Sequence, residues 1–177
     1  MRKYFYEIKR QDRNLNMRQY IYWIGPYRYN WHEELEIMLI LKGNVEMSCG
    51  GVSYSLQEDD LILIDSNVGH ASLARSEGSI AMVIHLNPEY LREYYSPIED
   101  YRFCGCTDET ARNSQEAKEI RRAMAVLITR MDTANPLERL RFERGLSQLL
   151  LLLFQLFPPR RIDRSEAVKT QKQEEMR

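Results

Sequence analysis

The hydrophobic period of this 177-residue chain changes near residue 87, and that change limits the possible folds more than any other pattern. Before it, runs rich in β-branched and aromatic residues alternate with turn signals; these runs are 18–25, 32–43, 44–56, 59–65 and 79–86. Closely spaced strand signals of this kind are typical of an all-β sandwich or barrel. After it, apolar residues recur at helical spacing. We therefore divide the chain into a β part, residues 1–87, and a helical part, residues 88–157.

Two helices are predicted in the second part. Asn113, followed three residues later by an acidic residue, predicts the start of the first helix. Asn135 and Pro136 predict the start of the second, with an Asn cap and Pro at the first helical position. This helix should end at Phe157, because two prolines follow. Residues 158–177 are polar and lack apolar periodicity, which predicts a linker or tail.

The overall composition excludes some classes of protein. A hydrophobic content of 44% is enough for a core, and a net charge of −1 gives no global imbalance that would indicate binding to nucleic acid or membrane. The longest apolar run, 149–157, is too short to span a bilayer. The odd cysteine set of Cys49, Cys104 and Cys106, without an N-terminal secretory pattern, indicates structural or free thiols in a reducing cytoplasm.

The segment 30–43 carries polar and apolar residues on alternate positions. In a strand, side chains two residues apart share a face. One face would carry His32, Glu34, Glu36, Met38 and Ile40, and the other would carry Glu33, Leu35, Ile37, Leu39 and Leu41. Unpaired carboxylates inside a barrel would cost several kcal/mol each. That cost is tolerable where water or a polar ligand meets the polar face.

The spacing of this segment resembles the first cupin motif. His32, Glu36 and Gly43 occupy the second-His, Glu and Gly positions, while Asn30 stands where the first His would be. His70 occupies the His position of the second cupin motif. Asp59, Asp65 and Asn67 replace the Gly, Pro and Gly of that motif.

A cupin barrel followed by two helices and a polar linker resembles the N-terminal domain of AraC-type transcription regulators. The resemblance implies a mainly β fold with C-terminal α-helices: a cupin-like double-stranded β-helix (jelly-roll) barrel that binds an effector, and a helical segment that mediates dimerisation. It implies a homodimer that is not an enzyme. DNA would be bound only through a helix-turn-helix domain that these 177 residues do not contain.

The resemblance and the strand pattern together indicate a binding site for a small polar effector such as a sugar. Carboxylates can bond hydroxyl groups, and aromatic rings can stack on a polyol. The ligand-binding candidates are His32, Glu34, Glu36, Met38, His70, Trp31 and Tyr22.

A metal at this site would be held by His32, Glu36 and His70, since imidazole and carboxylate suit iron, manganese, zinc or nickel. Asn30 is a poor fourth ligand, so neither a resident metal nor another cofactor is expected. A metal site and a purely structural polar cluster stay open as alternatives. The alternative function is a free-standing cupin metalloenzyme of the dioxygenase or isomerase type.

The helix expected over residues 136–157 indicates a dimer. Its second half, from Leu149 to Phe154, is apolar all the way round and must be covered on more than one side. A second copy of the chain is the expected partner. The residues expected at the interface are Leu146, Leu149, Leu150 and Leu153; burial within the monomer is the other possibility.

Overall fold

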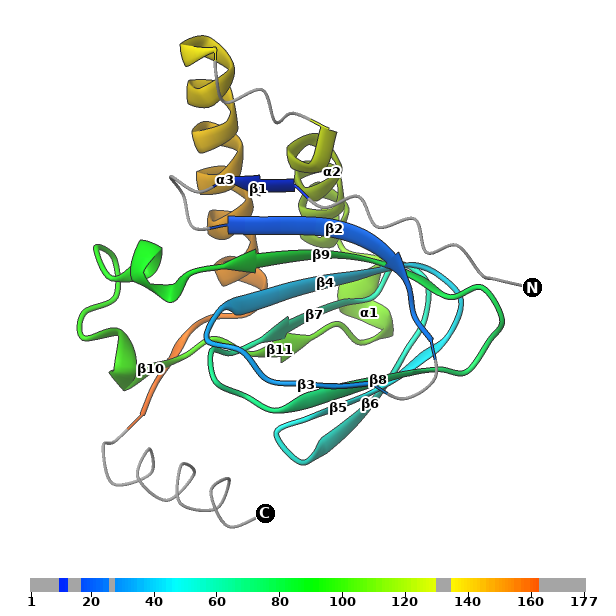
Figure 1. Cartoon of the computed structure of the whole chain (residues 1–177). Coiled ribbons are helices and arrows are strands. Elements are labelled where there is room, and N and C mark those ends of the chain that lie inside the picture. The colour runs from blue at the N-terminus through cyan, green and yellow to red at the C-terminus, as the bar shows by residue number, and fades with distance from the viewer. Residues whose placement is uncertain (1–9, 13–16, 26–27, 130–134, 163–177) are drawn as a thin grey trace.

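The structure is a computed structural model that describes residues 10–12, 17–25, 28–129 and 135–162 (Figure 1). The described strands are β1 (Arg10–Asp12), β2 (Met17–Trp23), β3 (Arg28–Asn30), β4 (Leu35–Lys42), β5 (Val45–Cys49), β6 (Val52–Leu56), β7 (Leu61–Ile64), β8 (His70–Ala74), β9 (Ile80–Leu86), β10 (Tyr101–Arg102), β11 (Gly105–Cys106) and β12 (Arg160–Arg161). The described helices are the 3₁₀ helices η1 (Pro88–Leu91) and η2 (Ile98–Asp100), and the α-helices α1 (Glu109–Arg112), α2 (Gln115–Thr129) and α3 (Pro136–Leu156).

Ten of the described strands form two facing sheets, as a jelly-roll barrel requires, and β10 and β12 form a separate two-stranded sheet. The larger sheet has the order β1-β2-β9-β4-β7-β11, and the smaller has the order β3-β8-β5-β6. Figure 1 shows α2 and α3 on one side of the larger sheet and the smaller sheet on the other. The fold is thus mainly β with C-terminal helices, as predicted.

Two hydrophobic clusters lie on opposite sides of the larger sheet. The inner cluster, between the sheets, includes Met38, Met47 and Val83. The outer cluster joins Ile37 and other outward side chains of the sheet to the helices. The polar Gln19 also faces outward, where its Nε2 donates to the Leu127 carbonyl at 3.1 Å. The sheet is therefore buried on both faces, which explains why β4, β7 and β9 read as continuous apolar runs.

The two faces of β4 are as the alternation predicts. Leu35, Ile37 and Leu39 belong to the outer cluster, whereas Met38 and Ile40 belong to the inner one. The strand is shorter than the pattern, however. It begins at Leu35, and residues 33 and 34 form a bend before it.

The two residues that replace the glycines of the second cupin motif have the left-handed backbone conformation that glycine adopts readily. Asp59 has φ 74° and Asn67 has φ 60°. Asp and Asn tolerate the left-handed region better than other residues with a Cβ. Gly43, at φ 84°, is required for a further reason, because a Cβ there would lie 2.5 Å from Ser79 Oγ. These turns therefore keep their geometry with altered residues.

Several predicted boundaries are wrong. Strand β11 lies beyond residue 87 yet pairs with β7, so the barrel takes a strand from the expected helical part. Strand β12, inside the expected tail, pairs with β10. Asn113 does not start a helix: it ends α1, and Ser114 Oγ accepts from the Ala117 amide in the first turn of α2. Tail residues 163–177 lie outside the described residues.

The start of α3 is as predicted, because Asn135 Oδ1 accepts from the Leu137 amide at 2.9 Å and Pro136 follows it. Its four expected interface residues, Leu146, Leu149, Leu150 and Leu153, are instead buried within the single chain, at 0–6% exposure. They pack in the outer cluster between α3, α2 and the sheet. In the described residues, no helix combines the length and apolar character needed to cross a membrane.

Candidate functional site

A row of polar side chains crosses the inner face of the larger sheet. Arg18 on β2 pairs with His85 on β9, and His85 pairs with Glu36 on β4. Cross-strand partners share a face, so the three side chains lie beside one another inside the barrel. Arg18 Nη2 donates to His85 Nδ1 at 3.1 Å, and His85 Nε2 lies 2.9 Å from Glu36 Oε2. The Tyr20 hydroxyl lies 3.0 Å from the same His85 nitrogen.

Two further histidines reach Glu36 from other parts of the chain. His32, in the segment between β3 and β4, places Nε2 2.9 Å from Glu36 Oε2. His70, at the start of β8 in the opposite sheet, places Nε2 3.4 Å from the same oxygen. All three histidines of the chain therefore surround one carboxylate. We call Glu36, His32, His70 and His85 the Glu36 cluster.

The electrostatics of the cluster favour a charged Glu36. Burial alone raises the pKa of this carboxyl, but its close polar contacts with the three histidines outweigh burial and hold the pKa well below its usual range. Burial alone lowers the pKa of His70, but the nearby charge of Glu36 outweighs it and raises that pKa. The 3.4 Å contact is an ion-pair distance, and His70 Nε2 has no hydrogen-bond partner.

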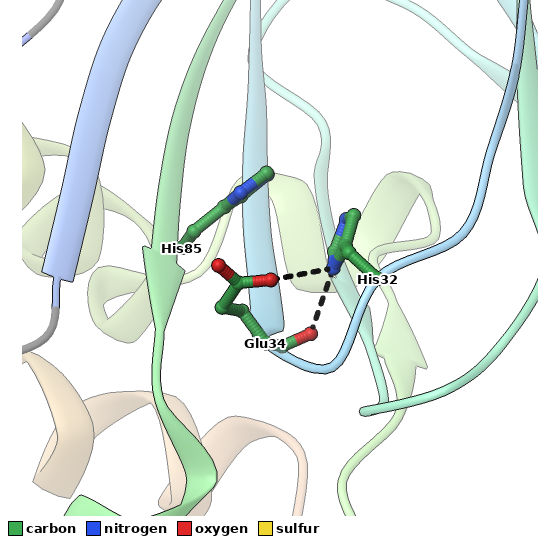
Figure 2. Close-up of side chains that lie close together, drawn as sticks. All are labelled: His32, Glu34 and His85. Atoms are coloured by element: carbon green, nitrogen blue, oxygen red, sulfur yellow. Dashed lines mark hydrogen bonds and ion pairs between the residues drawn. The ribbon is translucent and has the colours of Figure 1, made fainter.

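The cluster runs from the interior toward solvent. The side chains of His70 and Glu36 are 1% and 4% exposed, whereas those of His32 and Glu34 are 16% and 27% exposed. Figure 2 shows His85 extending from its strand toward His32, with Glu34 beside both. The His32 and His85 ring centroids are 4.3 Å apart. Glu34 also bonds Arg18, whose side chain is 46% exposed. A ligand could therefore approach Glu36 from solvent by passing His32, Glu34 and Arg18.

The structure brings together some of the predicted site residues and not others. His32, Glu34, Glu36 and His70 converge as predicted. Met38 is 2% exposed and belongs to the inner apolar cluster, so it forms part of the core.

The two predicted aromatic residues differ in exposure. Tyr22 is partly buried against the inner cluster, and its ring lies 5.6 Å from that of Tyr20. Trp31 is 57% exposed, next to His32 in sequence. Neither Arg18 nor His85 is among the site residues predicted from the sequence. The strand pairing that joins both to Glu36 is not visible in local sequence.

Two groups in the described part of the chain could hold a metal ion. They are His32–Glu36–His70 and His32–Glu34–His85, and in each group the ligand atoms lie within 4.8 Å of one another. The donor set of imidazole and carboxylate fits a divalent transition metal. The His70 nitrogen without a hydrogen-bond partner gives the first group a structural reason to accept one.

The cysteines do not add a reactive group. All three are free thiols, as the sequence predicts. Burial, together with nearby acidic groups and thiols, raises the pKa of Cys49 to about 12, and burial raises that of Cys106 to about 11. These thiols are therefore protonated at neutral pH and are poor nucleophiles and metal ligands.

A buried carboxyl beside the site gives a pH prediction. Burial raises the pKa of Asp65 from 3.8 to about 6, despite Arg102 at 3.6 Å. A carboxyl with a raised folded-state pKa contributes stability at low pH and loses it as pH rises through that value. Asp65→Asn keeps the oxygen that accepts from the Ser66 amide. We expect the change in the free energy of unfolding caused by Asp65→Asn to be roughly 3 kcal/mol more stabilising at about pH 8 than at about pH 4. Urea denaturation at both pH values checks this, and an equal effect would contradict it.

Comparison with known proteins agrees with this architecture. A profile of the family described as an AraC-like ligand binding domain matches residues 20–154. No match to a curated protein is found.

Similar solved structures include an RmlC-like cupin from Shewanella frigidimarina, with 15% identity and a TM-score of 0.37, covering 40% of this chain and 66% of that one. A cupin domain of an XRE family transcriptional regulator from Enterobacter cloacae has 15% identity and a TM-score of 0.43, over 47% of this chain and 94% of that one. An oxalate decarboxylase from Bacillus subtilis has 21% identity and a TM-score of 0.42, over 49% of this chain but only 26% of that one. The family match spans more than half of the sequence, and the chain belongs to the AraC-like ligand-binding domain family.

Proposed function

We propose that this chain is the effector-sensing and dimerisation domain of a cytoplasmic AraC-type transcription regulator, and that it binds a small polar molecule at the Glu36 cluster. The observation that carries the proposal is the gathering of every histidine of the chain around one buried carboxylate. A cluster serving only stability would be a costly solution, because apolar residues of similar volume often stabilise a core equally well. Perturbed titratable groups at one end of a barrel favour a binding role instead.

The chemistry of the cluster favours a ligand rich in hydroxyl or carboxyl groups. Glu36 and Glu34 offer acceptors, Arg18 offers donors, and each imidazole offers one of either kind. A sugar or another polyol suits this mixture, and the exposed Trp31 ring nearby could stack on it.

The second candidate is a cupin metalloenzyme of the dioxygenase or isomerase type. The His32–Glu36–His70 group favours it, since two imidazoles and a carboxylate also suit a catalytic metal. The family match favours the sensor instead, and we propose that the chain is not an enzyme.

The proposed regulator would act as a homodimer and would contact DNA through a helix-turn-helix domain outside these 177 residues. The exposed leucines of α3 give the dimer a surface. Leu137, Leu140 and Leu151 are 55%, 63% and 56% exposed, and their spacing places them on one side of the helix. These residues replace the buried leucines as the proposed interface.

A ligand panel tests the binding function. Thermal unfolding is followed with sugars, polyols and small carboxylic acids, for wild type and Glu36→Gln. A ligand at about a hundred times its Kd stabilises the folded state by roughly 2.7 kcal/mol. For a chain of this size that raises the wild-type Tm by roughly 5–10 °C. Glu36→Gln should show little of this increase. A ligand that stabilises both proteins equally would place binding elsewhere and contradict the proposal.

A further inference from the structure

A single turn, residues 65–68, is bonded to two histidines of the Glu36 cluster. His70 Nδ1 lies 3.0 Å from the Val68 carbonyl oxygen and donates to it, because a carbonyl only accepts. The Asn67 amide donates to the His32 carbonyl oxygen, also at 3.0 Å. One histidine is therefore attached to the turn through its ring and the other through its backbone.

The turn is closed by its own hydrogen bond, from the Val68 amide to the Asp65 carbonyl oxygen at 3.4 Å. A bond between the first and fourth residues is typical of a β-turn. The Ser66 hydroxyl donates to the Glu33 carbonyl, which adds a bond between the turn and the segment that carries His32. We therefore expect the four residues of the turn to shift together when either histidine moves.

The Asp65 side chain connects the same turn to β10. It is 7% exposed, and Arg102 Nε lies 3.6 Å from its Oδ2. Arg102 and the Phe103 backbone both stabilise the charged form of this carboxyl against the effect of burial. A partly buried pair of this kind is screened less by salt than a surface pair. A shift of the turn therefore changes an electrostatic contact of β10.

Strand β10 in turn pairs with β12, and this pairing is short. Each strand contributes two residues, and the Ile162 amide donates to the Asp100 carbonyl at 2.8 Å. Figure 1 shows the orange segment after α3 lying beside β10. Both residues of β12 are exposed. A two-residue pairing on the surface opens locally at little cost, so β12 has a paired and an unpaired state.

Opening of β12 leaves α3 in place. Phe157, which follows α3, packs so closely on Gly105 of β11 that a Cβ at Gly105 would lie 2.3 Å from its ring. The rings of Phe154 and Phe103 are 5.3 Å apart at the same end of the helix. Two prolines, at 158 and 159, separate these contacts from β12. The pairing of β12 can therefore change while the end of α3 stays packed on the barrel.

We propose that the turn 65–68 couples the Glu36 cluster to the pairing of β12 with β10, so that binding at the cluster changes the fraction of molecules in which β12 is paired. Coupling of this kind requires two sites and an element with two states that both sites bias, and β12 is that element. The regulatory meaning rests on the proposed function: the effector would hold or shift the histidines, and the DNA-binding domain that would follow β12 would receive the change.

Glu36→Gln tests the coupling without a ligand, because it removes the charge that the histidines face and keeps the size of the side chain. Loosened histidines should release the turn and raise the amide exchange rate of Ile162 by roughly fivefold, at the low end of typical coupling between sites. Solvent-exchange NMR measures this rate. The Arg75 amide, bonded to the Asn44 carbonyl at 2.8 Å beyond the other end of β8, is the internal reference and should not change.

Glu46→Gln is the matched control variant. It makes the same change of side chain on β5, where Glu46 is bonded to Arg75 at the surface. The Ile162 exchange rate should stay within twofold of wild type. An effect as large as that of Glu36→Gln would overturn the proposal, because it would show that any loss of a barrel carboxylate opens β12.

Asp65→Asn decides whether the turn carries the coupling. Asparagine keeps the oxygen that accepts from the Ser66 amide but removes the charge that faces Arg102. Combined with this substitution, Glu36→Gln should change the Ile162 exchange rate by less than twofold, since coupled residues are not additive. An equal change with and without Asp65→Asn would overturn the role of the turn. An Ile162 rate that Glu36→Gln alone leaves unchanged would overturn the coupling itself.

The coupling is also tested from the opposite end, because coupling free energies are reciprocal. Ile162→Pro removes the amide N–H that bonds Asp100, whereas Ile162→Ala keeps it. Both variants leave the barrel and the helices untouched, so both should fold. In NMR of isotope-labelled histidine, Ile162→Pro should shift the imidazole signal of His70, and Ile162→Ala should not. Identical histidine spectra of the two variants would contradict the proposal.

These tests are separable from that of the proposed function. If a small polar molecule stabilises wild type and not Glu36→Gln, but the Ile162 exchange rate is the same in both proteins, the coupling fails and the sensor proposal stands. If the exchange rates behave as described but every stabilising molecule acts equally on Glu36→Gln, the coupling stands and the sensor proposal fails.

Discussion

Glu36→Ala is expected to destabilise the chelator-treated chain by roughly 3–5 kcal/mol at about pH 5.5 and to abolish effector binding. The cost is large because the substitution leaves buried imidazoles without the carboxylate that faces them, and breaking a buried ion pair typically costs this much. At about pH 8 the His70 imidazole carries less charge than at about pH 5.5, so the cost should be smaller, roughly 1–3 kcal/mol.

The pH dependence follows from two pKa shifts. His70 has a raised pKa in the folded chain, so its contribution to stability is full below its usual value of 6.5 and is lost as pH rises through the raised value. Glu36 has a lowered pKa, so its contribution is full above 4.5 and is lost as pH falls through the lowered value. Both contributions are therefore complete between about pH 4.5 and pH 6.5. Glu36→Ala should reduce stability most in this range.

Urea denaturation of wild type and variant at both pH values measures the effect. Glu34→Ala is the matched control, because Glu34 lies two residues away but is more exposed and pairs with Arg18 near the surface. Its cost should stay below about 1 kcal/mol. If Glu36→Ala had the same cost at both pH values, or if Glu34→Ala were equally damaging, the cluster would not have the electrostatics described.

Leu153→Glu is expected to unfold the chain, whereas Leu151→Glu should leave it folded and dissociate the proposed dimer. The two leucines lie two residues apart on α3, but Leu153 is 0% exposed and Leu151 is 56% exposed. Removing a buried leucine costs about 2–5 kcal/mol, and burying an unpaired charge adds several more. That sum approaches the roughly 5–15 kcal/mol that stabilise a typical domain.

Circular dichroism and sedimentation velocity separate the two outcomes. Leu151→Glu should retain the wild-type spectrum and stability to within about 0.5 kcal/mol per monomer, as surface substitutions usually do. It should sediment as a monomer of 21.1 kDa. A Leu151→Glu protein that remains dimeric would exclude this side of α3 as the interface. A Leu153→Glu protein with wild-type stability would contradict the packing of α3 against the sheet.

The face pattern of β4 and the turn positions could be predicted from the sequence because both depend on local chemistry. Alternation fixes which side chains of a strand share a face, and it correctly separated Ile37 from Met38. Asp59 and Asn67 kept the left-handed turns because their side chains tolerate positive φ. The cap at Asn135 follows the same local logic.

The rest depends on which segments meet in space, and no single segment carries that information. Arg18 and His85 joined the site through the pairing of β2 and β4 with β9. Likewise, the apolar run at 149–154 shows that the helix must be covered, but it does not show which part of the molecule covers it. The sheet and α2 cover Leu149 and Leu153, so the apolar run at 149–154 is largely part of the core. The surface that is left for a partner consists of the more widely spaced exposed leucines of α3.

The central claim is that the chain binds its effector at the Glu36 cluster, and NMR of isotope-labelled histidine tests it most directly. The three imidazoles are all in the cluster, so their signals report on this site and on no other part of the chain. A small polar molecule that raises the Tm should shift the signals of His32, His70 and His85 at the same concentrations. If such a molecule stabilises the protein while all three imidazole signals stay unchanged, it binds elsewhere and the claim is wrong.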